Sequence, residues 1–88
     1  MELEFEDMTK VVKRLKRAQG QIGGILRMID EGRDCREIVT QLAAVSKAVD
    51  RAGFAVIASG LRQCLTEDTP EHARMDPAEL EKLFLSLA

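Results

Sequence analysis

Cysteine is the residue type in this 88-residue chain best suited to nucleophilic or metal chemistry, and it occurs twice, at Cys35 and Cys64. Both positions belong to one segment that we expect to form a single long helix. At ~1.5 Å of rise per residue their separation is roughly 43 Å, whereas a disulfide needs Cα atoms within about 7 Å of each other. A working pair therefore requires a second chain. An antiparallel copy of the helix would place Cys35 of one subunit beside Cys64 of the other, at two sites related by a two-fold axis.

The simpler interpretation is that both cysteines fill a core as small apolar residues. A cytoplasmic location is expected, because the sequence shows no signal or transit sequence and no apolar run near the ~18 residues of a membrane span. In a reducing cytosol, two isolated cysteines are more typical of metal binding or redox chemistry than of a structural disulfide.

The net charge of −2 conceals an uneven distribution of charged residues. Residues 9–51 hold ten Lys or Arg against five Asp or Glu, whereas residues 1–8 hold four acids and residues 52–88 hold six acids against three bases. The basic middle is suited to an anionic partner although the whole chain is acidic. Length and composition predict one small all-α domain, residues 1–88, which is too short to bury all its apolar positions and should therefore oligomerise.

Hydrophobic periodicity predicts three helices, at about residues 7–31, 35–65 and 77–87. Gly32 supplies a stop for the first helix. Asp34 and Glu37 form a capping box, which starts the second helix at Cys35. Asp76 and Pro77 give a start signal for the third.

The apolar positions of each helix are expected to face inward. These positions are Met8, Val12, Leu15, Ile22, Ile25 and Ile29 in the first helix; Ile38, Leu42, Val45, Val49, Ala52 and Val56, widened by Phe54, Ile57 and Leu61, in the second; and Leu80, Leu83, Phe84 and Leu87 in the third. Gly20, Gly23 and Gly24 interrupt the first helix at up to ~1 kcal/mol each, which predicts that another backbone approaches closely there.

The two cysteines should differ in reactivity. Cys35 is expected at the first position of its helix, where the positive end of the helix dipole and the neighbouring Arg33 and Arg36 favour a thiolate. Cys64 is expected in the last turn, where the dipole has the opposite sign. This asymmetry suits Cys35 as an attacking thiol and Cys64 as a resolving thiol.

A long run of residues resembles the copper-sensing operon repressor (CsoR-like) family. The run is RLKRAQGQIGGILRMIDEGRDC from Arg14 to Cys35, followed by DRAGF from Asp50 and then Cys64, and the resemblance covers about residues 9–66. It implies three helices per chain in an antiparallel helical-bundle dimer that assembles into a dimer-of-dimers tetramer. It further implies a repressor that binds operator double-stranded DNA without a helix-turn-helix and releases it when an inducer occupies the thiol site between subunits.

The resemblance also bears on the inducer. Family members sense copper(I), nickel or cobalt, formaldehyde, or reactive sulfur species. Copper sensors place a histidine where this chain has Gly60, and often a tyrosine where it has Asp34. The only histidine, His72, lies beyond the matched segment. The two-cysteine site therefore resembles the persulfide-sensing branch, which implies a small sulfur-donor inducer and no cofactor. Copper(I), held by the thiolates of Cys35 and Cys64, is the alternative.

Basic residues supply the expected DNA contacts. The set comprises Lys13, Arg14, Lys16, Arg17, Lys47 and Arg51. Arg14 and Arg51 match positions that the family uses on DNA, and Gln19 and Gln21 are candidates for additional polar contacts. Repeated four times in a tetramer, such a cluster predicts DNA binding with a steep dependence on salt.

Two other classes of function compete with a repressor. A thiol enzyme or sulfur carrier is disfavoured, because the sequence has no His/Asp constellation and no phosphate-binding glycine loop. A purely structural helical module explains the apolar stripes, but not the segregated basic residues or the cysteine at a helix start. We therefore expect a non-enzymatic regulator.

Overall fold

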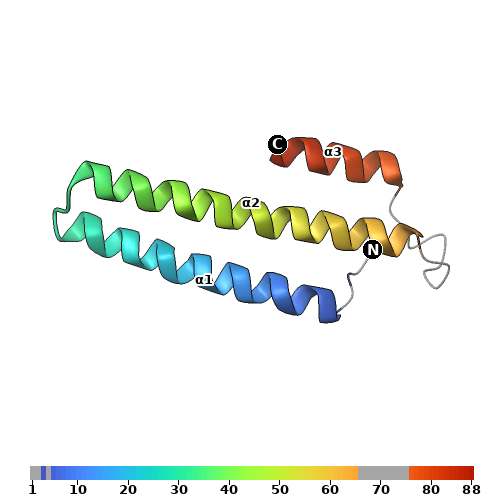
Figure 1. Ribbon diagram of the computed structural model, residues 1–88, viewed down its shortest axis with the longest axis horizontal. Coiled ribbons are helices and arrows are strands. Elements are labelled where there is room, and N and C mark those ends of the chain that lie inside the picture. Colours follow the sequence, from blue (N-terminus) through green and yellow to red (C-terminus); the bar gives the residue numbers. More distant parts are fainter. Residues whose placement is uncertain (1–2, 4, 66–75) are drawn as a thin grey trace.

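The computed structural model describes residue 3, residues 5–65 and residues 76–88. Its regular elements in this part of the chain are the helices α1 (Phe5–Asp30), α2 (Cys35–Leu65) and α3 (Pro77–Leu87). Figure 1 shows α1 and α2 as a long antiparallel hairpin, with α3 lying along α2 on the side away from α1. The molecule is elongated, with extents of 54 × 24 × 13 Å. The prediction of an all-α chain is confirmed.

A left-handed glycine ends α1. Gly32 has a φ of +70°, and the backbone N–H groups of Gly32 and Arg33 donate to the carbonyl oxygens of Ile29 (3.1 Å) and Met28 (2.9 Å). This pair of bonds is a Schellman motif, which satisfies carbonyls at the end of a helix. The chain therefore reverses within a few residues and returns along α1.

α2 begins at Cys35, where the backbone carbonyl of Asp34 accepts from the N–H groups of Glu37 (3.1 Å) and Ile38 (3.2 Å). The predicted capping box is not observed in either half: the acceptor at Asp34 is its backbone carbonyl, and the described part of the structure shows no hydrogen bond to its side-chain carboxylate. The carboxylate of Glu37 does not reach back to the N–H of Asp34 but accepts a hydrogen bond from Nε of Arg33 at 2.9 Å. Arg33 competes successfully because its guanidinium is a charged donor, and charged donors form stronger bonds than a neutral amide.

α3 packs on the second half of α2. The carboxylate of Asp76 accepts a hydrogen bond from the N–H of Ala78 at 3.1 Å, and Pro77 follows this N-cap. The ring centroids of Phe54 and Phe84 are 5.4 Å apart and tilted by 46°. A Cβ added at Gly53 would lie 2.8 Å from Cδ1 of Leu87, so the glycine permits the close approach of α3.

The buried core of the hairpin is a narrow line of residues between α1 and α2. Its apolar members are Val11, Ala18 and Ile25 from α1, spaced by seven residues, and Val45 and Ala52 from α2. Because two helices meet along only one line, a wide apolar stripe cannot be buried within a single hairpin. The rest of the stripe is left at the surface.

Several positions expected to face inward are therefore exposed in the single chain. These positions are Val12, Leu15, Ile22 and Ile29 of α1, and Leu42 and Val49 of α2. Together with Leu26 of α1, which was not among the expected positions, they form a group that we call the apolar face, and each member is between 42% and 64% accessible. In α3, Leu80 is buried as expected, whereas Leu83 and Phe84 are each nearly half exposed.

The glycines of α1 also differ from expectation. A Cβ added at Gly20 would meet nothing within 4 Å, and at Gly23 or Gly24 it would meet only the side chain of Arg27. Within the described part of the chain, no other backbone approaches α1 at these positions. No described helix is long and apolar enough to cross a membrane.

Candidate functional site

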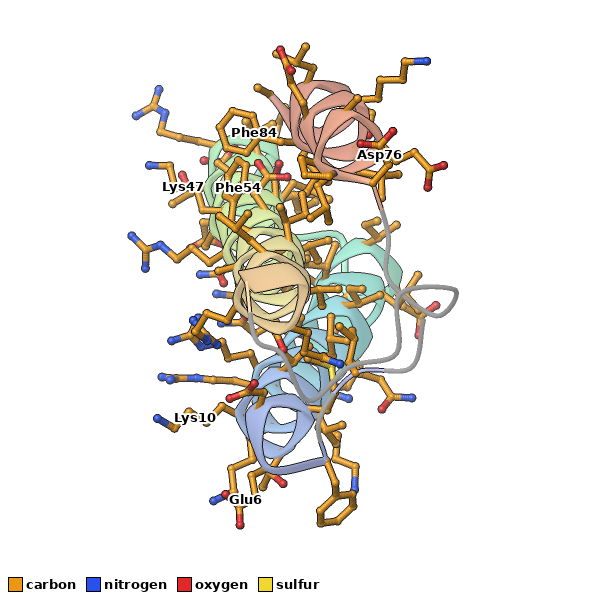
Figure 2. All side chains as sticks on the ribbon, turned by 90° about the vertical axis from the view of Figure 1, so that its right-hand side faces the viewer. Glu6, Lys10, Lys47, Phe54, Asp76 and Phe84 are labelled. Carbon is orange, nitrogen blue, oxygen red and sulfur yellow. The ribbon has the colours of Figure 1, made fainter. Side chains whose placement is uncertain are left out.

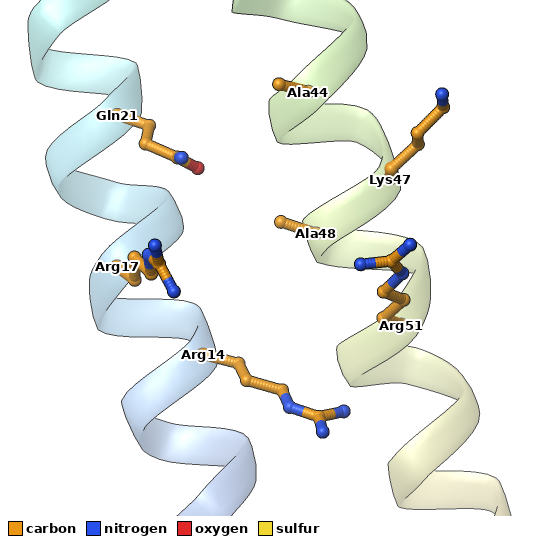
Figure 3. Close-up of a pocket in the computed structure, with 7 residues that line it drawn as sticks. All are labelled: Arg14, Arg17, Gln21, Ala44, Lys47, Ala48 and Arg51. Carbon is orange, nitrogen blue, oxygen red and sulfur yellow. The ribbon is translucent and has the colours of Figure 1, made fainter.

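A cleft with cationic walls runs between α1 and α2. It is lined by Arg14, Arg17, Gln21, Ala44, Lys47, Ala48 and Arg51, and its volume is about 390 Å³ (Figure 3). The two alanines leave room between the helices because their side chains are short. Figure 3 shows Arg14 extending from α1 toward α2, Arg17 lying over α1, and Lys47 and Arg51 carried by α2. We call this feature the cationic cleft.

The lining of the cationic cleft is strongly one-sided in charge. Four of its seven residues carry a positive charge, and none is an acid. Gln21 contributes a buried side-chain oxygen, Oε1, for which the structure shows no hydrogen-bond partner. Figure 2 shows that Lys10 and Lys47, one on each helix, extend toward the same side of the hairpin. A negatively charged, hydrogen-bonding group is the natural occupant of such a cleft.

The six basic residues predicted to contact DNA do not all lie together. Four of them line the cationic cleft. Lys13 and Lys16 instead line a different hollow on α1, beside Phe5, Met8 and Val12. The reason is helical geometry, since each residue turns about 100° around the axis and only some positions of the basic run share one face.

Cys35 and Cys64 lie at opposite ends of α2. Cys35 is the first residue of the helix and is exposed with a free thiol. Cys64 lies in the last turn, and its side chain is outside the described part of the structure. The unbroken helix between them keeps the two Cα atoms roughly 43 Å apart, so the two residues cannot meet within one chain. They are about eight full turns apart, and their Cα atoms consequently lie along the same line of the helix.

The surroundings of Cys35 differ from expectation in one respect. The guanidinium of Arg33 lies 2.9 Å from a carboxylate oxygen of Glu37 and 3.8 Å from one of Glu31. The hydrogen bond from Arg33 to Glu37 raises the pKa of Arg33 above its usual value. Arg33 is thus engaged with carboxylates, and Arg36, which forms no ion pair with a described residue, is the more available cation beside the thiol.

The other residues weighed for metal binding contribute little in the single chain. Gly60 is buried in α2 and has no side chain to offer as a ligand. His72 lies outside the described residues. Within the described part of one chain, no group of three His, Cys, Asp or Glu side chains gathers.

One polar cluster was not anticipated from the sequence. Oγ of Ser59 donates a hydrogen bond to Oδ2 of Asp7 at 3.0 Å, and the guanidinium of Arg62 lies 3.5 Å from Oδ1 of the same aspartate. The cluster joins the first turn of α1 to the last turns of α2. No local sequence signal marks this contact, because it joins residues 52 positions apart.

Comparisons with known proteins place this chain among bacterial regulators. The copper-sensing transcriptional repressor RicR of Mycobacterium tuberculosis is 37% identical over 59 residues, which cover 67% of this chain and 62% of RicR. The copper-sensing transcriptional repressor CsoR of Bacillus subtilis is 27% identical over 62 residues, covering 70% of this chain and 61% of CsoR. The chain spans less than two thirds of the length of both proteins.

A third relative matches over more of its length. The transcriptional repressor RcnR of Citrobacter koseri is 29% identical over 76 residues, which cover 86% of this chain and 84% of RcnR. The sequence profile of metal-sensitive transcriptional repressors, which are regulators and not enzymes, matches residues 7–86. Because this match covers nearly the whole chain, the protein belongs to the metal-sensitive transcriptional repressor family.

Proposed function

We propose that this protein is a transcriptional repressor that binds operator double-stranded DNA through the cationic cleft. In this proposal it leaves the DNA when Cys35 and the partner subunit's Cys64 react with a persulfide or polysulfide. The observation that carries the proposal is the two-sided hairpin, with the cationic cleft on one side and the apolar face on the other. One side is suited to DNA phosphates and the other to a second copy of the chain.

The cationic cleft supports phosphate binding. Arg14, Arg17, Lys47 and Arg51 supply four positive charges without an opposing acid in the lining. Gln21 adds a side-chain amide to the lining, and its NH₂ group is a donor of the kind that phosphate oxygens accept. Such contacts fix the position of a protein on DNA and make its affinity depend on salt.

The apolar face supports self-association. Its residues on α1 and α2 are large, contiguous along the hairpin and roughly half exposed, which is unusual for a surface that contacts only water. A second hairpin packed on it in antiparallel orientation would bring Cys35 of one subunit to the helix end that carries Cys64 of the other. The thiol site of this proposal is therefore complete only in the oligomer.

The chemistry has two balanced steps. The Cys35 thiolate attacks the outer sulfur of a persulfide RSSH, forming a Cys35 persulfide and releasing the thiolate RS⁻. The thiolate of the partner subunit's Cys64 then attacks Sγ of Cys35, forming a disulfide between the two cysteines and expelling the outer sulfur as hydrosulfide, HS⁻. The sulfane sulfur of the persulfide is thereby reduced to sulfide while the two protein thiols are oxidised. Attack on a longer polysulfide would leave additional sulfur in the bridge.

Copper(I) is the second candidate inducer, because two of the relatives are named as copper-sensing repressors. Two thiolates are soft ligands that suit copper(I). Gly60 supplies no third ligand, so copper(I) would be held by the two sulfurs alone. The persulfide proposal is preferred because its chemistry needs only the two thiols.

The decisive experiment uses the reduced full-length chain and a duplex selected from random-sequence DNA for tight binding. Sodium tetrasulfide, copper(I) and hydrogen peroxide are each added, and DNA binding is followed beside intact mass under non-reducing conditions. The proposal expects tetrasulfide to release the DNA and to produce a covalent dimer, and expects neither effect in Cys35→Ala or Cys64→Ala. Release by copper(I) without release by tetrasulfide would establish the alternative, and release by neither would refute both.

A further inference from the structure

We infer that Asp7 is a positioning residue that couples the state of the thiol site to the cationic cleft. This inference rests on the proposed function, since it assigns a route between the two sites that the proposal requires. The route is the polar cluster formed by Asp7, Ser59 and Arg62. It is the described side-chain link that joins the first turn of α1 to the end of α2.

The link depends on the buried hydroxyl of Ser59. Only 1% of the surface of Ser59 is accessible, and its Oγ donates to the carboxylate of Asp7 at 3.0 Å across a sequence separation of 52 residues. A buried hydroxyl that loses its partner is costly, and a bond to a charged acceptor is stronger than one to a neutral acceptor. Arg62 adds an ion pair to the second carboxylate oxygen at 3.5 Å. Asp7 therefore holds α2 at two points.

The position of the link suits a coupling role. Ser59 and Arg62 lie five and two residues before Cys64, within the last two turns of α2. Asp7 lies two turns before Arg14 on the same face of α1, and Arg14 is a wall of the cationic cleft. One end of the link therefore lies in the last two turns of α2, the part of the helix that includes Cys64, and the other end lies on α1, which carries part of the cleft lining.

A crosslink at Cys64 displaces the last turn of α2 toward the partner subunit. With the link intact, the first turn of α1 follows the last turn of α2, whereas Lys47 and Arg51 lie earlier in α2 and stay in place, so that Arg14 and Arg17 shift relative to them. With the link cut, the end of α2 moves while α1 stays, so the cleft retains more of its DNA-binding geometry. Loss of the link thus reduces the ratio of the DNA dissociation constants of the crosslinked and reduced proteins, which is the measure of coupling.

The test compares Asp7→Asn and Ser59→Ala with wild type. Each protein is purified reduced, treated with sodium tetrasulfide, and checked for the covalent dimer by intact mass. Dissociation constants for the selected duplex are then measured in both states. We expect both variants to crosslink as wild type does, while the ratio of dissociation constants falls by about 5-fold or more, a change within the usual range of allosteric coupling.

Two matched controls separate coupling from charge and from folding. Glu6→Gln removes the same charge from the same turn, at an exposed residue that forms no bond with α2 in the described structure, and should leave the ratio unchanged. Asp7→Glu keeps the carboxylate and should restore most of the ratio. Removing a negative charge near DNA strengthens binding in both states alike, so a pure charge effect cancels in the ratio.

The outcomes distinguish this inference from the proposed function. If tetrasulfide fails to release wild type from DNA, the proposed function fails. If wild type is released and both Asp7→Asn and Ser59→Ala keep its ratio, only the role of Asp7 is refuted. A reduced ratio in Asp7→Asn but not in Ser59→Ala would refute the dependence of the link on the buried hydroxyl of Ser59, because Asp7 would then act through its ion pair with Arg62.

Discussion

Replacing Arg51 by Gln removes one of the four cations of the cationic cleft and should flatten the salt dependence of DNA binding. If each of the four contacts one phosphate, the logarithm of the binding constant falls against the logarithm of salt concentration with a slope of about −3.6 for each chain that engages DNA. Arg51→Gln should reduce this slope to about −2.7. At 0.1 M salt, the DNA-binding constant of Arg51→Gln is then roughly 8-fold below that of wild type for each engaged chain.

The salt titration magnifies the difference. Between 50 and 200 mM salt, wild type should lose affinity by a factor of about 150 for each engaged chain, and Arg51→Gln by a factor of about 40. The measurement is fluorescence anisotropy of a labelled operator duplex at several salt concentrations. Size-exclusion chromatography with light scattering checks that the assembly is unchanged.

Lys16→Gln is the matched control, because it removes one positive charge from α1 outside the cationic cleft. Its slope should stay closer to that of wild type than the slope of Arg51→Gln does. An unchanged slope in Arg51→Gln would refute phosphate binding by the cleft. An equal loss in Lys16→Gln would show that the charge of the whole surface matters and the cleft does not.

Four further predictions concern the fold and the assembly. Gly32→Ala should destabilise the chain by about 1–2 kcal/mol, measured by urea unfolding, because an alanine is strained at a φ of +70°, and Gly32→Asn should cost less. Asp76→Ala should cost about 1 kcal/mol through loss of the α3 cap and speed amide exchange in that helix, whereas protection equal to wild type would contradict the cap. Ile25 is only 5% exposed, and Ile25→Ala should lower the free energy of unfolding by about 2–5 kcal/mol. Leu26 lies on the exposed apolar face, and Leu26→Glu should leave helicity intact and yield monomers in sedimentation.

Helix boundaries were accessible from the sequence because the signals that end and begin helices are local. Gly32 adopts the left-handed conformation of a helix stop, and Asp76 caps α3 from the position next to Pro77. The detail of the α2 cap was not accessible in the same way. Glu37 had two donors within reach, and only the structure shows that the guanidinium of Arg33 is the one it binds.

The core was harder to predict because the apolar stripe of α1 is wider than one helix contact. Periodicity could not tell which edge of the stripe faces α2, and the buried line runs through Val11 and Ala18, whereas Val12 and Leu15 are exposed. A stripe that serves two contacts has the same sequence pattern as one that serves a single broad contact. Separating them requires the position of the neighbouring helix.

The candidate site shows the same division between local and long-range information. The basic residues of the sequence include four that line the cationic cleft, but their division between this cleft and the neighbouring hollow follows from how α1 faces α2. The contact between Asp7 and Ser59 joins residues 52 positions apart, and neither residue lies in a recognisable motif. The role of Cys35 and Cys64 as a pair stays a prediction, since it depends on a second subunit.

The thiols lie at the two tips of α2 and the cationic cleft lies along its middle, and this separation has an evolutionary consequence. In the proposed function, a few substitutions at the tips would change the signal that is recognised while the contacts of the cleft with DNA are preserved. Conversely, substitutions that change the preferred operator would leave the recognition of the signal intact. One short scaffold can therefore be inherited by regulators of very different stresses.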